Sequence, residues 1–240
     1  MAEASWANSA EAWIRRIDEG ERNRELLLDP VMLDLCADVR GQRVLDVGCG
    51  EGRFSRMLGA QGATTIALDP TPGLANAAYE RGTGNVVRAR GEWLPIGSES
   101  VDLVVSYLVL VDVEGYREAI AEMARVLAPG GAIVLCNMSF VSAASPWVRD
   151  EQGRRAYRTI DRYLEERSLH LEWAGISITN WHRPLSAYMG AFLGAGLLLE
   201  KFVEPLPEDE SLRDDPYCED WFRVPEFVAM RWRKPPWGPA

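Results

Sequence analysis

Short runs of β-branched residues alternate with helical segments between residues 43 and 138. The runs RVLDVG, TTIALD, NVVRAR, VDLVVSYL and AIVLCNM are the expected strands. After Gly115, apolar residues recur at i, i+3, i+4 and i+7, which predicts a crossover helix that stops at Pro129. Strands joined by such helices form a parallel sheet, so the alternation predicts an α/β fold.

The flanking sequence predicts further elements around this sheet. Residues 1–40 place apolar residues on helical faces and are expected to form an N-terminal helical cap. The alternation lapses over about residues 139–182, an aromatic-rich stretch that we expect to be a lid insertion after the fifth strand. A helix starting at Pro184 precedes LLLEKFVEP and FVAMRWR, the expected sixth and seventh strands. The main domain is therefore expected to span residues 41–240.

Composition narrows the classes of partner. The formal net charge of -10 disfavours nucleic acid, because binding to phosphates requires clustered Lys and Arg. The four cysteines form no CxxC pair, so neither a metal site nor a disulfide framework is predicted. No apolar run of about 18 residues suits a membrane span, and the first residues lack a secretory signal pattern. We expect a cytoplasmic protein whose partner is a small molecule, with no nucleic acid and no membrane involved.

The most specific local signal is VLDVGCGEGRFSRM, in which a strand runs through Gly48, Gly50 and Gly52 into a helix. Glycines there allow a sharp turn and a close approach to a ligand, because a Cβ would occupy the space or forbid the dihedral angles. A dinucleotide fingerprint would have a third glycine where Arg53 stands. Asp46, two residues before Gly48, separates the two patterns further.

This stretch resembles motif I of the class I S-adenosylmethionine (SAM)-dependent methyltransferases, and the resemblance extends over roughly residues 41–138. It implies a Rossmann-like, seven-stranded, mostly parallel sheet with flanking helices, SAM as cofactor and S-adenosylhomocysteine as product. The family pattern implies that Asp46 positions the methionine part of the cofactor and that Gly48, Gly50 and Gly52 pack against it. RVLAPGG resembles the RVLKPGG sequence that precedes the fifth strand in this family.

Asp69 ends the second expected strand, within TTIALDPTPGL. A carboxylate at that place can accept hydrogen bonds from both hydroxyl groups of a ribose. NAD-binding folds use the same arrangement, so Asp69 and the adjoining Pro70 indicate an adenosine ligand without specifying which one. The alternative is that Asp69 only forms the turn before Pro70.

The segment VVRARGEWLPIGSESVDLVVSYL resembles the GDAExLPF segment and the following FDxVxS strand of the same family. Relatives use an Asp to hold the adenine amino group, but Arg90 stands at that position, and a guanidinium can only donate. The backbone of Gly91, the Glu92 carboxylate or the face of Trp93 is expected to hold the adenine instead. A core Trp93 and a solvated Glu92 are the alternatives.

Ser106 and Tyr107 end the fourth expected strand. Open α/β sheets bind their ligands beyond the carboxyl ends of the strands, so both residues are expected to lie near the cofactor. Family usage implies that a backbone carbonyl there faces the methionine amino group.

Methyl transfer needs few catalytic groups, because the acceptor attacks in line and the enzyme chiefly supplies orientation and exclusion of water. Where the acceptor must lose a proton, histidine suits neutral pH, and the chain has two histidines. His182, in NWHRPLSAYM, is the expected general base. This block resembles a segment of a bacterial small-molecule subgroup, similar to ubiquinone and menaquinone methyltransferases. The alternative is that His182 braces the start of the next helix.

Three further residues are expected to face the acceptor: Trp13, Asp112 and Arg183. The tryptophans suggest an apolar cover suited to an aromatic or hydrophobic metabolite. The expected activity is therefore methyl transfer from SAM to an oxygen, nitrogen or carbon atom of such a molecule. One alternative is a SAM-binding protein without methyl transfer, which Arg90 leaves open. The other is an NAD-dependent oxidoreductase, which the motif spacing disfavours.

Overall fold

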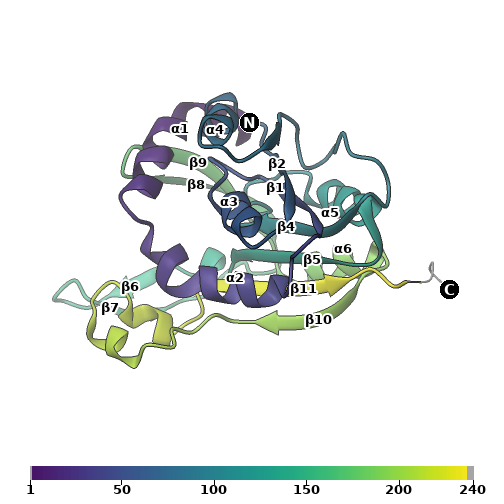
Figure 1. Ribbon diagram of the computed structural model, residues 1–240. Helices are drawn as coiled ribbons and strands as arrows, with labels where there is room; N and C mark the ends of the chain where they lie inside the picture. Colours follow the sequence, from purple (N-terminus) through teal and green to yellow (C-terminus); the bar gives the residue numbers. More distant parts are fainter. Residues whose placement is uncertain (1, 237–240) are drawn as a thin grey trace.

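The computed structural model describes residues 2–236, with side chains from residue 6 onward except that of residue 143. It contains a seven-stranded sheet in the order β10-β11-β5-β4-β1-β2-β3, in which β11 is antiparallel to both neighbours (Figure 1). The strands are β1 (Arg43–Val47), β2 (Thr64–Leu68), β3 (Asn85–Val87), β4 (Val101–Tyr107), β5 (Leu127–Met138), β10 (Leu198–Val203) and β11 (Phe227–Arg233). The predicted seven-stranded, mostly parallel sheet is confirmed.

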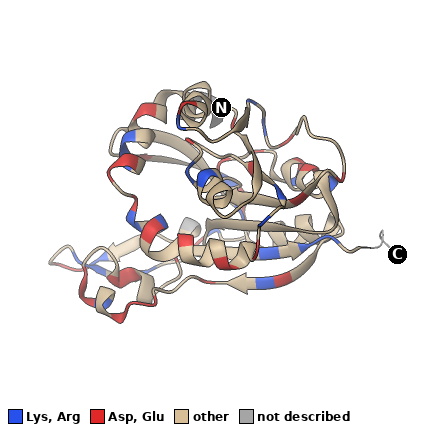
Figure 2. Cartoon of the chain, in the orientation of Figure 1, with Lys and Arg blue, Asp and Glu red and all other residues tan. Residues whose placement is uncertain are grey.

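Helices cover both faces of the sheet (Figure 1). They are α1 (Ala2–Asp18), the π-helical turn η1 (Arg24–Leu28), α2 (Asp29–Cys36), α3 (Arg53–Ala60), α4 (Pro72–Glu80), α5 (Tyr116–Val126) and α6 (Leu185–Gly194). Side chains alternate along the central strands, so Val44 and Leu103 pack with α2 and α3. Leu45 and Val104 pack with α5 and α6 on the other face. Strand β5 carries no charged residue, as expected for a strand buried between two layers (Figure 2).

The aromatic-rich stretch after β5 forms two β-hairpins in place of a further strand and helix. They comprise β6 (Trp147–Arg149) with β7 (Arg155–Arg158), and β8 (Arg167–Trp173) with β9 (Ile176–His182). A two-residue turn joins β8 to β9, with Ala174 at φ 47° and Gly175 at φ 79°. Positive φ at both positions gives a turn whose twist matches the two strands. Strand β9 lies beside α1, and its Ile176 and Ile178 pack on Ala12 (Figure 1).

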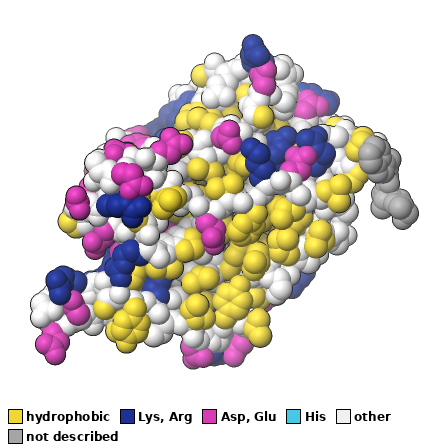
Figure 3. All heavy atoms as spheres, turned by 90° about the horizontal axis from the view of Figure 1, so that it is seen from below, with side chains coloured by type: hydrophobic (Ala, Val, Ile, Leu, Met, Phe, Trp, Pro, Cys, Tyr) yellow, Lys and Arg dark blue, Asp and Glu magenta, His cyan; other side chains and the backbone are white. Residues whose placement is uncertain are grey.

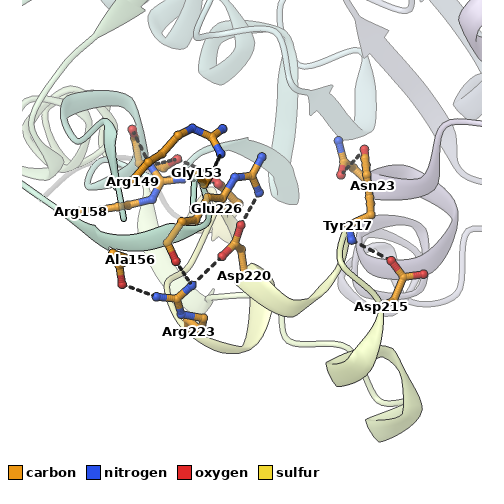
Figure 4. Close-up of polar contacts among 12 residues, drawn as sticks. Asn23, Arg149, Gly153, Ala156, Arg158, Asp215, Tyr217, Asp220, Arg223 and Glu226 are labelled. Carbon is orange, nitrogen blue, oxygen red and sulfur yellow. Dashed lines mark hydrogen bonds and ion pairs between the residues drawn. The ribbon is translucent and has the colours of Figure 1, made fainter. Parts of the chain in front are cut away.

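Ion pairs fasten the β6–β7 hairpin to the segment before β11 (Figure 4). Arg158 pairs with Glu226, which lies 68 positions further along the chain. Arg223 donates to the carbonyl of Ala156 at 2.5 Å. The guanidinium groups of Arg158 and Arg223 lie over the ring of Trp147, at 4.6 and 4.8 Å from its centroid. The short 3₁₀ turns η2 (Ser142–Ala144), η3 (Glu210–Asp214) and η4 (Glu219–Phe222) complete this end of the molecule.

Strand β10 forms one edge of the sheet and exposes apolar side chains. Leu198 is 54% exposed and Phe202 is 40% exposed, and Figure 3 shows hydrophobic side chains gathered on this side of the molecule. No described strand pairs with the outer side of β10, so the described residues give it no sheet partner on that side. Among the described helices, none is long and apolar enough to cross a membrane.

Candidate functional site

A cavity opens at the carboxyl ends of β1, β2 and β4, where the strand order reverses. Open α/β sheets bind ligands at such a point. Helix α1 and η1 contribute the opposite wall. The residues predicted from the sequence that line this cavity are Trp13, Asp46, Gly48, Gly50, Asp69, Pro70, Gly91, Glu92, Tyr107 and Asp112. Gly52, Trp93, Ser106, His182 and Arg183 are not part of its lining.

Backbone hydrogen bonds fold the glycine loop back on the end of β2. The N–H groups of Gly48 and Cys49 both donate to the carbonyl of Leu68, at 2.7 and 2.9 Å. Gly48 has φ +74°, and an added Cβ would lie 2.5 Å from both methyl groups of Val109. A side chain at Gly48 would therefore displace Val109, itself part of the cavity wall.

Gly50 and Gly52 face different surroundings. A Cβ on Gly50 would lie 3.7 Å from the indole nitrogen of Trp13, and both residues line the cavity. A Cβ on Gly52 would lie 2.1 Å from the hydroxyl of Thr83. Gly52 precedes α3 and its α-carbon faces Thr83, so this glycine does not line the cavity and its contact with the cofactor stays a prediction.

Asp69 lies directly after β2 and is held by the loop that it faces. One carboxylate oxygen accepts from the N–H of Gly50 at 2.9 Å, and the other accepts from the N–H of Thr71 at 2.8 Å. Each oxygen keeps further lone-pair capacity toward the cavity. Burial raises the pKa of Asp69 to about 6, and the two N–H groups oppose that rise.

Asp46 is the buried acid of β1. Its carboxylate accepts from the hydroxyl of Ser55 at 2.6 Å. Burial raises the pKa of Asp46 to about 6, the Ser55 hydrogen bond opposes the rise, and the nearby Asp69 adds to it. A cation or a hydroxyl donor in the cavity would favour the ionised form of both acids.

The segment after β3 reaches the cavity through Arg90, Gly91 and Glu92. Trp93 does not reach it, because the backbone turns tightly and the Trp93 N–H donates to the Arg90 carbonyl at 3.2 Å. The indole of Trp93 is 82% exposed. The alternative that Trp93 packs in the core is therefore wrong, and its contact with the adenine stays a prediction.

The two residues at the end of β4 separate because side chains alternate along a strand. Tyr107 lines the cavity, and its hydroxyl donates to the carboxylate of Asp29 at 3.0 Å. The Ser106 side chain points to the opposite face, fully buried, and the described residues give its hydroxyl no partner. The next residue, Leu108, lines the cavity with φ +59°, a strained backbone value for leucine.

His182 lies at the end of β9, fully buried. Its Nε2 atom is 2.7 Å from the carbonyl of Tyr163, and burial lowers the pKa of the imidazole. The expectation that His182 faces the acceptor is corrected, because the β8–β9 register turns its side chain toward Tyr163. His182 has the surroundings of a brace for the hairpin.

Arg183 is also buried, and it organises the loop that follows β4. Its guanidinium donates to the carbonyls of Leu110 at 2.8 Å and Glu114 at 3.0 Å. It also donates to the hydroxyl of Tyr188 at 3.0 Å. The expected contact of Arg183 with the acceptor is corrected, because its donors are used to hold the loop that carries Asp112.

Asp112 extends from that loop into the cavity. Its carboxylate accepts hydrogen bonds from the side chains of Asn180 in β9 and Trp6 in α1. The surrounding protein removes water from the carboxyl group and raises its pKa to about 8, although these two hydrogen bonds oppose the rise. Three segments far apart in the sequence therefore meet at one titratable group.

Sequence reasoning missed Trp6, Arg24 and Leu108 as cavity residues. Trp6 and Trp13 form an edge-to-face pair with centroids 5.6 Å apart. Trp6 lies seven residues before Trp13, a spacing that places both on one face of a helix. This spacing could have indicated that Trp6 lines the cavity together with Trp13. Nothing in the local pattern around Arg24 or Leu108 indicates a site.

Comparison with known proteins gives one family match. Residues 45–135 match the family model described as a methyltransferase domain. A demethylmenaquinone methyltransferase from Clavibacter sepedonicus is 36% identical over 107 residues, which cover 43% of this chain and 44% of that protein. A malonyl-[acyl-carrier protein] O-methyltransferase from Serratia marcescens is 31% identical over 140 residues, covering 58% of this chain and 51% of that protein. The chain spans about half the length of the curated relatives it matches.

Solved structures show the same architecture over most of the chain. The structure of a SAM-dependent methyltransferase from Mesorhizobium loti superposes with a TM-score of 0.78 at 26% identity, covering 90% of this chain and 99% of that one. A putative SAM-dependent methyltransferase from Listeria monocytogenes superposes with a TM-score of 0.75 at 21% identity, covering 85% and 96%.

Proposed function

Residues 45–135 are a methyltransferase domain of the class I, SAM-dependent type, and we propose that the whole chain transfers the methyl group of SAM to a small-molecule acceptor. The observation that carries this proposal is the meeting of the glycine loop, Asp46 and Asp69 around one cavity at the carboxyl ends of the strands. The names of two relatives, acting on demethylmenaquinone and on malonyl-[acyl-carrier protein], support an acceptor outside the nucleic acids.

The residues of the cavity fit SAM. Asp69 would accept from the ribose hydroxyl groups with the lone-pair capacity that Gly50 and Thr71 leave. Asp46 would lie beside the cationic methionine part, and Arg90, Gly91 and Glu92 would surround the adenine. When bound, SAM supplies an electrophilic methyl group on its sulfonium. Since burial raises the pKa of both Asp46 and Asp69 to about 6, ligand binding and their ionisation reinforce each other.

The acceptor is proposed to bind between α1 and the loop after β4. Trp6, Trp13, Leu108 and Val109 give this part of the cavity an apolar wall, which suits an aromatic or hydrophobic molecule. Asp112 is the titratable group of that wall, and a pKa of about 8 suits a base that works near neutral pH. We assign it the proton that an oxygen or nitrogen acceptor loses on methylation.

Incubation with methyl-labelled SAM and a panel of phenols, hydroxylated polyketides, quinols and amines tests this proposal. We expect label to move to one acceptor class, with one S-adenosylhomocysteine released per methyl group transferred. Binding of S-adenosylhomocysteine without transfer to any member would favour the alternative of a SAM-binding protein. Oxidation or reduction of a panel member with NAD would favour the oxidoreductase alternative.

A further inference from the structure

The segment that ends β9 holds the loop that follows β4. The backbone N–H of Trp181 donates to the carbonyl of Val111 at 2.6 Å. The guanidinium of Arg183 donates to the carbonyls of Leu110 at 2.8 Å and Glu114 at 3.0 Å. These hydrogen bonds lie on both sides of the loop residue whose carboxyl group reaches the cavity. The hairpin after β5 therefore fixes the backbone of a loop that belongs to the central sheet.

Asn180, also in β9, adds a contact from its side chain. It is 7% exposed, and its amide N–H donates to a carboxylate oxygen of Asp112. Along the strand, Asn180 projects on the same face as Ile176 and Ile178, which pack on Ala12 of α1. A buried amide on such an apolar face costs free energy unless it is hydrogen-bonded. Asp112 supplies that partner, so the two side chains hold each other in place.

The surroundings of Asp112 decide what this hydrogen bond does to its charge. A donor beside a carboxylate favours the ionised form, so the amide of Asn180 lowers the pKa that burial raises. Groups from four other parts of the fold also interact electrostatically with this carboxyl: Trp6 in α1, Arg24 in η1, Asp69 after β2 and Tyr188 in α6. Trp6 and Arg24 favour the ionised form and Asp69 opposes it. Asn180 does so as a neutral donor that does not itself titrate.

We propose that Asn180 is a positioning residue for methyl transfer, whose amide holds the Asp112 carboxylate toward the acceptor and in its ionised form. This inference rests on the proposed function, in which Asp112 is the base. A lone pair of the acceptor atom forms the bond to the methyl carbon, the sulfur keeps the electrons of the broken C–S bond, and the acceptor proton moves to Asp112. Asn180 is not part of the cavity lining, so it acts through Asp112.

Carbon-13 NMR titration of the Asp112 carboxyl group tests this contact without an acceptor. The variant is Asn180→Leu, which removes the donor and keeps a side chain of similar size, and Asp112→Asn identifies the resonance. Loss of the hydrogen bond should raise the pKa of Asp112 by about one pH unit above its wild-type value of about 8. Thr179→Val, on the opposite face of the same strand, should leave this pKa unchanged.

Single-turnover methyl transfer gives a second readout of the same contact. Asn180→Leu should bind S-adenosylhomocysteine like the wild type, and its pH–rate midpoint should lie about one pH unit higher. At a pH below both midpoints its rate should therefore be about 10-fold lower or less. In the Asp112→Asn background, Asn180→Leu should change the rate no further, because the group through which it acts is absent.

The inference is overturned if folded Asn180→Leu keeps the wild-type titration of Asp112 and the wild-type rate at every pH. It is equally overturned if Asn180→Leu slows transfer as much in the Asp112→Asn background as in the wild type. Should Asn180→Leu not fold, Asn180→Ala removes the same donor. A wild-type rate in Asp112→Asn alone would overturn the base assigned in the proposed function, and because that result needs no Asn180 variant, the two failures are distinguishable.

Discussion

Replacing Gly48 with valine is expected to abolish measurable binding of SAM and S-adenosylhomocysteine. The new Cβ would lie 2.5 Å from both methyl groups of Val109, and φ +74° disfavours a β-branched residue. The loop would have to move, and its two hydrogen bonds to the Leu68 carbonyl would be lost with it. Isothermal titration calorimetry measures the affinity, and circular dichroism shows whether the variant is folded.

Gly41→Val is the matched control for this variant. Gly41 has nearly the same backbone angle, φ +73°, but an added Cβ would meet nothing within 4 Å. It should cost about 1 to 2 kcal/mol of stability from the left-handed conformation alone and leave the affinity unchanged. Should Gly48→Val misfold, the smaller Gly48→Ala carries the same test. Wild-type affinity in a folded Gly48 variant would contradict the assignment of this loop to the cofactor.

Asp112→Asn is expected to lower single-turnover methyl transfer by about 100-fold or more while leaving the affinity for S-adenosylhomocysteine nearly unchanged. The amide keeps the size of the side chain but cannot take a proton. The base is the ionised form, so the wild-type rate should rise with pH and then level off. The pKa of Asp112 is about 8 before SAM binds, and the sulfonium cation lowers it, so the rise should be complete at or below pH 8. The variant should lose this titration.

His182→Gln separates this base from the histidine that sequence reasoning favoured. His182 is buried against Tyr163 and does not line the cavity, so its substitution should lower the melting temperature and leave the pH profile of transfer in place. If Asp112→Asn retained the wild-type rate and His182→Gln lost it, the assignment of Asp112 as the base would be wrong.

The sheet could be predicted because its signals are local. Each central strand is a β-branched run next to a turn or a helix, and the site residues Asp46 and Asp69 lie within or directly after such runs. The hairpins after β5 could not be predicted as readily. The strands of β6–β7 are held by partners such as Glu226, far along the chain, and no local pattern encodes such a contact.

The residues of the candidate site also divide into those that local sequence signals predict and those that depend on distant contacts. The glycine loop follows directly from β1, and the sequence predicts where β1 ends. Most residues of this loop could therefore be predicted to line the cavity. The orientation of three other side chains depends on the face of the strand from which each projects and on the backbone carbonyls that lie near it. These are Ser106, His182 and Arg183. Arg24 depends on the packing of η1 against Tyr107 and Trp13. Such orientations follow from tertiary packing, which a single sequence does not display.

The most direct test of the central claim is a calorimetric titration of the wild-type protein with SAM, S-adenosylhomocysteine and NAD, each in a separate experiment. The arrangement of the glycine loop, Asp46 and Asp69 predicts one site for SAM and for S-adenosylhomocysteine, and no binding of NAD at the same concentrations. Binding of NAD with no heat from SAM or S-adenosylhomocysteine would contradict it.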